Sequence, residues 1–123
     1  MNSIKLTKIS KSEFENYKSI FLEAKENEFL LCICSNQPND NKTLGYLWYS
    51  LSNDYIFILD FFVYNKFKGK GYGTQTIQKL QSISLKKNIH QIRLRVARSN
   101  KRAFKLYQEL GFITTGINMI KWF

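Results

Sequence analysis

A short glycine-rich stretch between a predicted strand and a predicted helix constrains this fold more than any other sequence feature. It reads Lys-Gly-Lys-Gly-Tyr-Gly-Thr over residues 68–74, after the apolar run Tyr55–Tyr64 and before the helical pattern Thr74–Lys87. Glycines permit left-handed backbone geometry and let a ligand approach the main chain. A helix N-terminus adds free N–H groups and the positive end of the helix dipole. The stretch therefore predicts a strand–loop–helix unit that binds a phosphate-bearing ligand; a solvated connection is the alternative interpretation.

Two common phosphate-binding motifs do not fit this spacing. The nucleoside-triphosphate loop requires a lysine directly after its last glycine, whereas Thr74 follows Gly73. The dinucleotide fingerprint requires two residues between its second and third glycines and an acidic residue about 20 positions later. Here the glycines alternate with single residues, and residues 90–95 are basic. The spacing excludes both motifs.

Charge is distributed unevenly along the chain. Residues 1–65 contain six Lys and eight Asp or Glu, a net charge of −2, whereas residues 66–123 contain 13 Lys or Arg and one acid, Glu109, a net charge of +12. A basic half fits an anionic ligand, either a polyphosphate cofactor or nucleic acid. The acids of the first predicted helix fit either a solvated surface or a cationic substrate.

Length and composition predict one domain over residues 1–123, because 44% of the residues are hydrophobic and can form a core. No apolar run approaches the ~20 residues that span a bilayer, and the N-terminus lacks the apolar region of a secretion signal. We therefore expect a cytoplasmic protein. Cys32 and Cys34 are expected to be packed strand side chains, and with His90 the only histidine they form no zinc site, so no metal is expected.

The hydrophobic pattern predicts a mixed α/β order. Short turns among the second to fourth strands imply an antiparallel meander, and the strand–loop–helix–strand order implies a right-handed crossover to a parallel strand. Asp60, the single charge in its strand, points either to solvent or into a cleft. The predicted strands are Ser3–Lys8, Phe29–Ser35, Thr43–Leu51, Tyr55–Tyr64, Ile89–Val96, Phe112–Thr115 and Ile117–Phe123, and the predicted helices are Lys11–Asn27, Thr74–Lys87 and Ser99–Leu110.

Two motifs at a fixed separation resemble those of the GNAT-type N-acetyltransferases. The stretch from Val63 to Gly73 resembles the acetyl-CoA loop of that family, which has Gln/Arg-x-x-Gly-x-Gly/Ala after a strand ending in valine. Asn-x-x-Ala-x-x-Leu-Tyr-x-x-x-Gly-Phe, from Asn100 to Phe112, is similar to the family's second cofactor motif. The resemblance implies the GNAT fold: a central mixed, mostly antiparallel sheet of six to seven strands, with parallel, splayed fourth and fifth strands and helices on both faces.

The resemblance also implies a reaction, the transfer of an acetyl group from acetyl-CoA to a primary amine in a ternary complex. Tyr107 matches the family tyrosine that protonates the departing thiolate. Asp60 is the candidate base for the amine, with a bound-water relay and a structural role for Asp60 as the alternatives. Tyr46 and Trp48 are candidate walls of the acceptor site. The residues implied in acetyl-CoA binding are Phe61, Phe62, Val63, Lys68, Gly69, Lys70, Gly71, Tyr72, Gly73, Thr74, Asn100, Ala103, Phe104 and Tyr107.

The sequence departs from the family pattern in places that leave questions open. Lys68 replaces the usual arginine or glutamine and Asn65 the common proline, although neither change removes a backbone donor. The N-terminal part, which covers the acceptor in the family, is short, so a small amine, an aminoglycoside, a polyamine and a protein amine all stay open. The alternatives to an enzyme are a nucleic-acid-binding module, without a recognisable signature, and a non-catalytic acyl-CoA sensor. Family members often pair through late strands, so a homodimer is a further implication.

Overall fold

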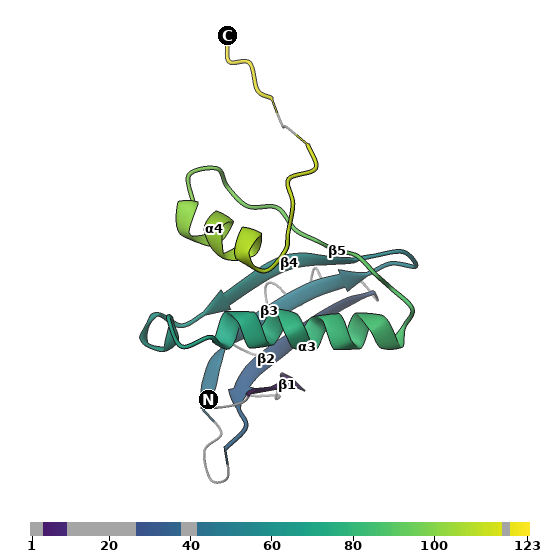
Figure 1. The fold of residues 1–123 in the computed structure, drawn as a ribbon, viewed down its shortest axis with the longest axis vertical. Coiled ribbons are helices and arrows are strands. Elements are labelled where there is room, and N and C mark those ends of the chain that lie inside the picture. Colours follow the sequence, from purple (N-terminus) through teal and green to yellow (C-terminus); the bar gives the residue numbers. More distant parts are fainter. Residues whose placement is uncertain (1–3, 10–26, 38–41, 117–118) are drawn as a thin grey trace.

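The protein, in a computed structural model that describes residues 4–9, 27–37, 42–116 and 119–123, forms one sheet with two α-helices and a short 3₁₀ turn within these ranges (Figure 1). Each strand lies beside the next in the order β1-β2-β3-β4-β5. The elements are β1 (Ile4–Lys8), β2 (Glu28–Ser35), β3 (Thr43–Leu51), β4 (Ile56–Val63), η1 (Asn65–Phe67), α3 (Tyr72–Lys86), β5 (Ile92–Arg93) and α4 (Lys101–Glu109).

The sheet has the predicted mixed topology. Strands β1 to β4 pair antiparallel, and β4 pairs parallel with β5. A parallel neighbour requires a crossover, which α3 provides. The prediction for β5 was too long, because pairing with β4 stops after Phe57 opposite Arg93. The predicted alternation holds beyond the strand, since Leu94 and Val96 are half-buried and Arg95 is exposed.

Helix α3 covers one face of the sheet and fixes the end of the glycine-rich segment in space (Figure 1). Tyr72, the first helical residue, packs with Ile4, Ile33 and Leu44 of three strands. Full burial of one such side chain contributes about 1.5–3 kcal/mol, so the helix start is anchored firmly. The main core cluster consists of Leu47, Tyr49, Ile56, Ile58, Ile77 and Leu80.

The other face carries its own apolar cluster, in which Cys32 and Cys34 pack with Leu30 and Tyr46. Both cysteines are buried, and neither forms a disulfide within the described residues, which confirms the prediction of packed thiols. The predicted helix Lys11–Asn27 lies outside the described residues except at its last residue, as does the turn around Pro38. In the described part of the chain, neither helix has the length and apolar character needed to cross a bilayer.

The segment after α4 differs from the prediction of a closing hairpin. Residues 112–116 and 119–123 form no strand, and the yellow C-terminal trace extends away from the sheet (Figure 1). Ile113 is 82% exposed and Trp122 is 88% exposed. The apolar residues favour an extended chain, but a strand also needs a neighbour for its backbone groups. The mixed fold is therefore confirmed with five strands among the described residues instead of six to seven.

Candidate active site

The chain leaves β4 through η1 and a loop in which two glycines have left-handed backbone geometry. The amide of Lys68 closes the turn by donating to the Asn65 carbonyl at 3.2 Å. Gly69 follows with φ of +78° and Gly71 with φ of +84°, a region that is unfavourable for other residues. The glycine spacing in the sequence therefore corresponds to two sharp changes of direction directly before α3.

The backbone amides at the start of α3 form a run of free donors. The first bond of the helix is from the Gln75 amide to the Gly71 carbonyl, at 3.1 Å. Within the described residues, the amides of residues 69–74 make no hydrogen bond. They lie at the positive end of the α3 dipole, where anions bind. The Lys68 amide was also predicted to be a free donor, and this is wrong because it is bonded to Asn65.

Positive charge surrounds these donors. The ammonium groups of Lys66 and Lys70 lie 5.1 Å and 6.0 Å from the centre of the Phe67 ring. Two cations near one aromatic ring gain a cation–π attraction that offsets part of their mutual repulsion. The first turn of α3 contains no acid, and Lys68 is exposed. The loop therefore combines directed N–H groups with full positive charges, a combination that fits a diphosphate. Phe67 was not among the predicted site residues, although its position between the lysines was visible in the sequence.

The edge of β4 next to this loop is open. Trp48 pairs with Asp60 and Tyr49 with Ile58, so Leu59 is an extra residue that forms a β-bulge. Bulges bend a strand away from its neighbour, and among the residues that the structure describes β4 has no strand partner on its β5 side after Phe57.

Alternation identifies which β4 amides face that open edge. The Tyr64 amide donates to the Leu44 carbonyl of β3 at 2.8 Å. Since alternate amides of a strand point the same way, Phe62 also points to β3, whereas Phe61 and Val63 point to the open edge. Of the three β4 residues that the resemblance places in acetyl-CoA binding, Phe61 and Val63 thus have amides on the open edge, whereas the amide of Phe62 points to β3.

Helix α4 brings Tyr107 to the same region. Asn100 caps the helix, its side-chain oxygen accepting from the Ala103 amide at 3.2 Å. One turn on, the side chain of Leu106 lies near Gly73 in the first turn of α3. A Cβ atom placed on Gly73 would be 3.7 Å from Leu106 Cδ2 and 3.7 Å from Phe61 Cζ. The helix that carries Tyr107 thus lies beside the first turn of α3, at the point where Phe61 of β4 also approaches Gly73. Ala103 and Phe104 are half-buried on the same helix.

Asp60 and Tyr107, the two predicted catalytic residues, interact electrostatically. Burial raises the pKa of Tyr107 above its ordinary value of 10.0, and the negative charge of Asp60 raises it further. The phenol is therefore protonated at neutral pH and available as a donor. Asp60 itself is exposed, so a polar group can reach it from solvent. The structure brings this acid and this phenol to one place from positions 47 residues apart.

Tyr46 and Trp48 lie on the sheet face opposite α3. Tyr46 is buried, with its ring centre 5.5 Å from that of Phe62 and 6.0 Å from that of Tyr64. Trp48 is half-buried opposite Asp60, and residues directly opposite in an antiparallel pair share a face. Within the described residues, Trp48 Nε1 is the one buried side-chain donor without a hydrogen-bond partner. Aromatic side chains and an acid therefore lie together on this face.

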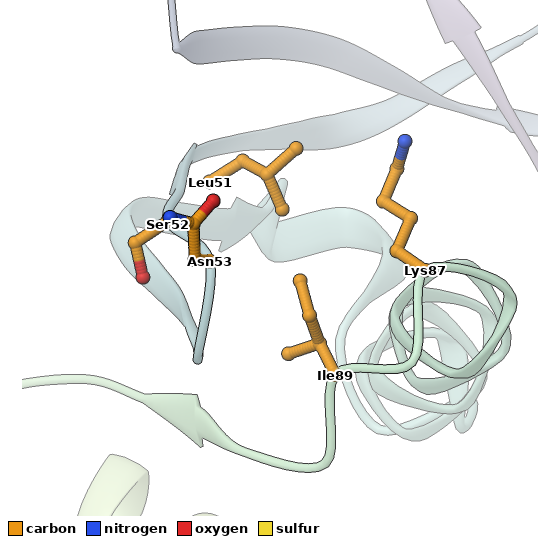
Figure 2. Close-up of a pocket in the computed structure, with 5 residues that line it drawn as sticks. All are labelled: Leu51, Ser52, Asn53, Lys87 and Ile89. Atoms are coloured by element: carbon orange, nitrogen blue, oxygen red, sulfur yellow. The ribbon is translucent and has the colours of Figure 1, made fainter.

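A separate hollow of about 260 Å³ lies at the other end of α3, far along the helix from the glycine-rich loop (Figure 2). Leu51 and Ile89 form its apolar side, and Ser52, Asn53 and Lys87 line its rim. None of the predicted site residues lines it. Among the described residues, no three His, Cys, Asp or Glu side chains lie close enough together to hold a metal ion.

Comparison with known proteins decides the family. The model of the acetyltransferase (GNAT) family matches residues 4–112, most of the chain. The chain belongs to the GNAT family. The match includes both the glycine-rich loop and the motif that contains Tyr107, so the family inferred from these motifs is confirmed.

Curated GNAT relatives include bacterial and mammalian proteins. The uncharacterized N-acetyltransferase YycN of Bacillus subtilis is 32% identical over 87 residues, which cover 68% of this chain and 56% of YycN. Thialysine N-epsilon-acetyltransferase of Sus scrofa is 31% identical over 97 residues, 70% of this chain and 57% of that protein. The chain thus spans a little over half the length of the curated relatives it matches.

Solved structures confirm the GNAT fold. The crystal structure of YycN from Bacillus subtilis has a TM-score of 0.80 at 23% identity and covers 98% of this chain and 99% of that chain. The aminoglycoside N-acetyltransferase AAC(6')-Iy in complex with CoA has a TM-score of 0.74 at 15% identity, with 99% and 95% coverage. At these identities the likeness concerns the fold.

Proposed function

We propose that this GNAT protein is an acetyl-CoA-dependent N-acetyltransferase that acts on a primary amine, with residues 1–123 as one catalytic domain. The observation that carries the proposal is the run of free amides at residues 69–74 beside the helix of Tyr107. Free N–H groups at a helix start bind phosphate, and a protonated phenol close by can serve a departing thiolate.

The residues present fit the diphosphate of coenzyme A. The amides of residues 69–74 would donate to its oxygens, while Lys66 and Lys70 would add positive charge. The amides of Phe61 and Val63 face the open edge of β4, where the arm that carries the thioester would lie beside them. Asn100 holds the start of α4 and would keep that helix against the ligand.

Bound acetyl-CoA would supply an activated thioester carbon. The amine forms the new C–N bond as the C–S bond breaks, and one proton leaves the nitrogen while another reaches the sulfur. An alkylammonium has a pKa of ~10.4 and must first lose a proton, for which Asp60 is the proposed base, directly or through water. Tyr107 donates to the departing sulfur, and an amide of Phe61 or Val63 stabilises the charge on the thioester oxygen.

The acceptor is proposed to be a cationic amine. Asp60 is an exposed acid, Trp48 lies opposite it and Tyr46 belongs to the cluster against which Trp48 packs, and such a set attracts an ammonium group. The names of two relatives are consistent with amine acceptors: one is a thialysine N-epsilon-acetyltransferase, and one solved neighbour is an aminoglycoside N-acetyltransferase.

A two-part experiment tests the function. Thermal unfolding with acetyl-CoA should show a saturable rise in Tm, since a ligand that binds only the folded state stabilises it by about 2.7 kcal/mol at 100 times its Kd. A panel of thialysine, lysine, spermidine, neamine and a peptide amine should then release free coenzyme A thiol with at least one acceptor.

Each other result has a defined meaning. A Tm rise without thiol release from any amine would favour an acyl-CoA sensor. Salt-dependent binding to DNA or RNA that coenzyme A does not displace would favour a nucleic-acid-binding module. The absence of any Tm rise at millimolar acetyl-CoA would contradict the enzymatic proposal.

We also propose a cytoplasmic location and pairing of two copies through their late segments. The exposed apolar residues Met119, Ile120, Trp122 and Phe123 are consistent with such pairing, because exposed apolar clusters commonly mark contacts. Light scattering of the purified chain tests the pairing directly: a monomer mass at high concentration would contradict it.

A further inference from the structure

We propose that Phe112 is a positioning residue that holds the ring of Tyr107 in place from the end of α4. This inference rests on the proposed function, since it takes Tyr107 as the proton donor. Tyr107 belongs to a nine-residue helix in which no residue is fully buried. A helix this short is marginal by itself, so the direction of the Tyr107 side chain depends on what anchors the helix end.

The backbone provides the first anchor. Gly111 has φ of +97°, and its amide donates to the Gln108 carbonyl at 3.0 Å. The Phe112 amide donates to the carbonyl of Tyr107 itself at 2.9 Å. This pair of bonds is a Schellman motif, which reverses the chain and brings the residue after the glycine back over the last turn. Phe112 is therefore tied directly to the backbone of Tyr107.

The rings provide the second anchor. Their centres are 5.5 Å apart with planes at 68°, an edge-to-face contact of the kind that aromatic pairs prefer. Phe112 also packs against the core cluster that includes Ile58 of β4 and Ile77 of α3. One side chain thus connects the Tyr107 ring to the strand that carries Asp60 and to the helix that begins at the glycine-rich loop.

Two variants separate a positioning role from simple core filling. Phe112→Leu keeps much of the apolar volume but removes the aromatic edge, whereas Phe112→Tyr keeps the edge. The test measures kcat and KM with acetyl-CoA and thialysine for the wild type, for both variants, for Tyr107→Phe, and for the double variant Tyr107→Phe/Phe112→Leu.

The expected result is non-additive. Phe112→Leu should lower kcat about tenfold in the wild-type background, because a displaced catalytic group costs rate, with KM for acetyl-CoA unchanged. It should have less than about a twofold effect once the Tyr107 hydroxyl is gone, and Phe112→Tyr should stay near wild type. An equal loss in both backgrounds would overturn the positioning role but leave the proposed function standing. A normal kcat in Tyr107→Phe would overturn the acid role of Tyr107 and this inference with it.

A second readout needs no acceptor. The ¹³C resonance of the Tyr107 phenol carbon, identified by its loss in Tyr107→Phe, reports the pKa of this group. Removing the covering ring in Phe112→Leu should lower that pKa toward its ordinary value, because it exposes the phenol to water, and Phe112→Tyr should not. Asp60 is present in every variant, so its charge does not explain a difference. An unchanged pKa in Phe112→Leu would overturn the proposal.

Discussion

The two ends of α3 treat their backbone groups in opposite ways. At the N-terminal end, the amides of residues 69–74 make no hydrogen bond within the described part of the chain. At the C-terminal end, the amides of Asn88 and Ile89 donate to the carbonyls of Leu85 at 3.0 Å and Ser84 at 2.9 Å. Asn88 has left-handed φ of +58°, as a Schellman cap requires, and the Ser84 hydroxyl donates to the Ile89 carbonyl at 2.7 Å.

This difference separates a structural end of α3 from a binding end. We call the C-terminal end, residues 84–89, the closed end and the N-terminal end, residues 69–74, the open end. The closed end needs no further partner, and Lys86 complements the negative end of the helix dipole. At the open end, the amides of residues 69–74 take no part in backbone pairing within the described residues, and these donors and the nearby cations suit an anion instead. The hollow at the closed end (Figure 2) does not change this assignment, because the amides of four of its five lining residues, Leu51, Ser52, Lys87 and Ile89, already donate to backbone carbonyls.

The largest expected effect concerns the chemistry at the open end. Tyr107→Phe should lower kcat by about 10²-fold, because a positioned general acid contributes 10²–10⁴, while the Kd of acetyl-CoA changes by less than about twofold. Stopped-flow or steady-state thiol release measures kcat, and calorimetry measures Kd. The matched control is Tyr55→Phe near the closed end, where Tyr55 stacks on Arg93 and kcat should be unchanged. Equal effects of both variants would contradict the role of Tyr107.

The next effect concerns the acid beside that phenol. Asp60→Asn should lower kcat at neutral pH by about tenfold or more, because it removes the proposed base. It should also lower the pKa of Tyr107, since the Asp60 charge raises it, although burial keeps that pKa above 10.0. A ¹³C titration of Tyr107 checks the shift. An unchanged or increased Tyr107 pKa would show that the two groups do not interact.

Glycine-to-alanine substitutions at two nearby positions, Gly71 and Gly73, test the role of left-handed backbone geometry in binding. Gly71→Ala forces a side chain into left-handed geometry, at a cost of about 1–2 kcal/mol, and should weaken coenzyme A binding about tenfold. Gly73→Ala is the control, because its Cβ meets only ordinary contacts at 3.7 Å; it should keep affinity and raise Tm slightly through helix propensity. Calorimetry and thermal unfolding measure both. Comparable affinity losses would argue against a special role for the Gly71 conformation.

Lysines at the two ends of α3 should have different effects on the affinity for coenzyme A. Lys70→Ala should weaken coenzyme A binding about threefold, the size expected for one exposed charge near an anion, with a smaller effect at high salt. Lys87→Ala, at the closed end, should leave affinity unchanged. Binding measured at two salt concentrations tests this pair, and a salt-independent or equal effect of both would mean that the loop lysines do not contact the ligand.

The smallest effect on function is expected at Asn88, the cap of the closed end, where substitution should change stability and leave coenzyme A binding unaltered. Asn88→Ala should lower the free energy of unfolding by about 1 kcal/mol, since alanine is unfavourable in left-handed geometry, and Asn88→Gly should restore it. Neither should alter coenzyme A affinity. Urea unfolding measures the stability, and a loss of affinity in Asn88→Ala would break the separation between the two ends.

Local patterns predicted much of this arrangement. The glycines predicted left-handed turns, which the structure confirms at Gly69 and Gly71. The predicted helix end at Lys87 is followed by Asn88 with φ of +58°, and Asn100, at the predicted start of the next helix, caps α4. These features depend on residue types that act within a few positions of themselves, and such preferences are readable from the sequence.

Other features depend on contacts between distant segments and were not predicted. The bulge at Leu59 lies two residues beyond Phe57, the last β4 residue that pairs with β5, but nothing in the residue types around it specifies an extra residue. The lack of strands in residues 112–116 and 119–123 also depends on distant contacts, because apolar alternation predicts extended backbone but does not supply a partner strand. The edge-to-face contact between Tyr107 and Phe112 likewise depends on the turn at Gly111, and it could be recognised only from the structure.

The most direct test of the central claim is an NMR titration of the ¹⁵N-labelled protein with coenzyme A. If the open end of α3 binds the diphosphate, the amide signals of residues 69–74 shift downfield and gain protection from exchange, while those of residues 87–89 stay in place. Saturable binding that leaves the amides of residues 69–74 unchanged, or that instead shifts residues 87–89, would contradict the account.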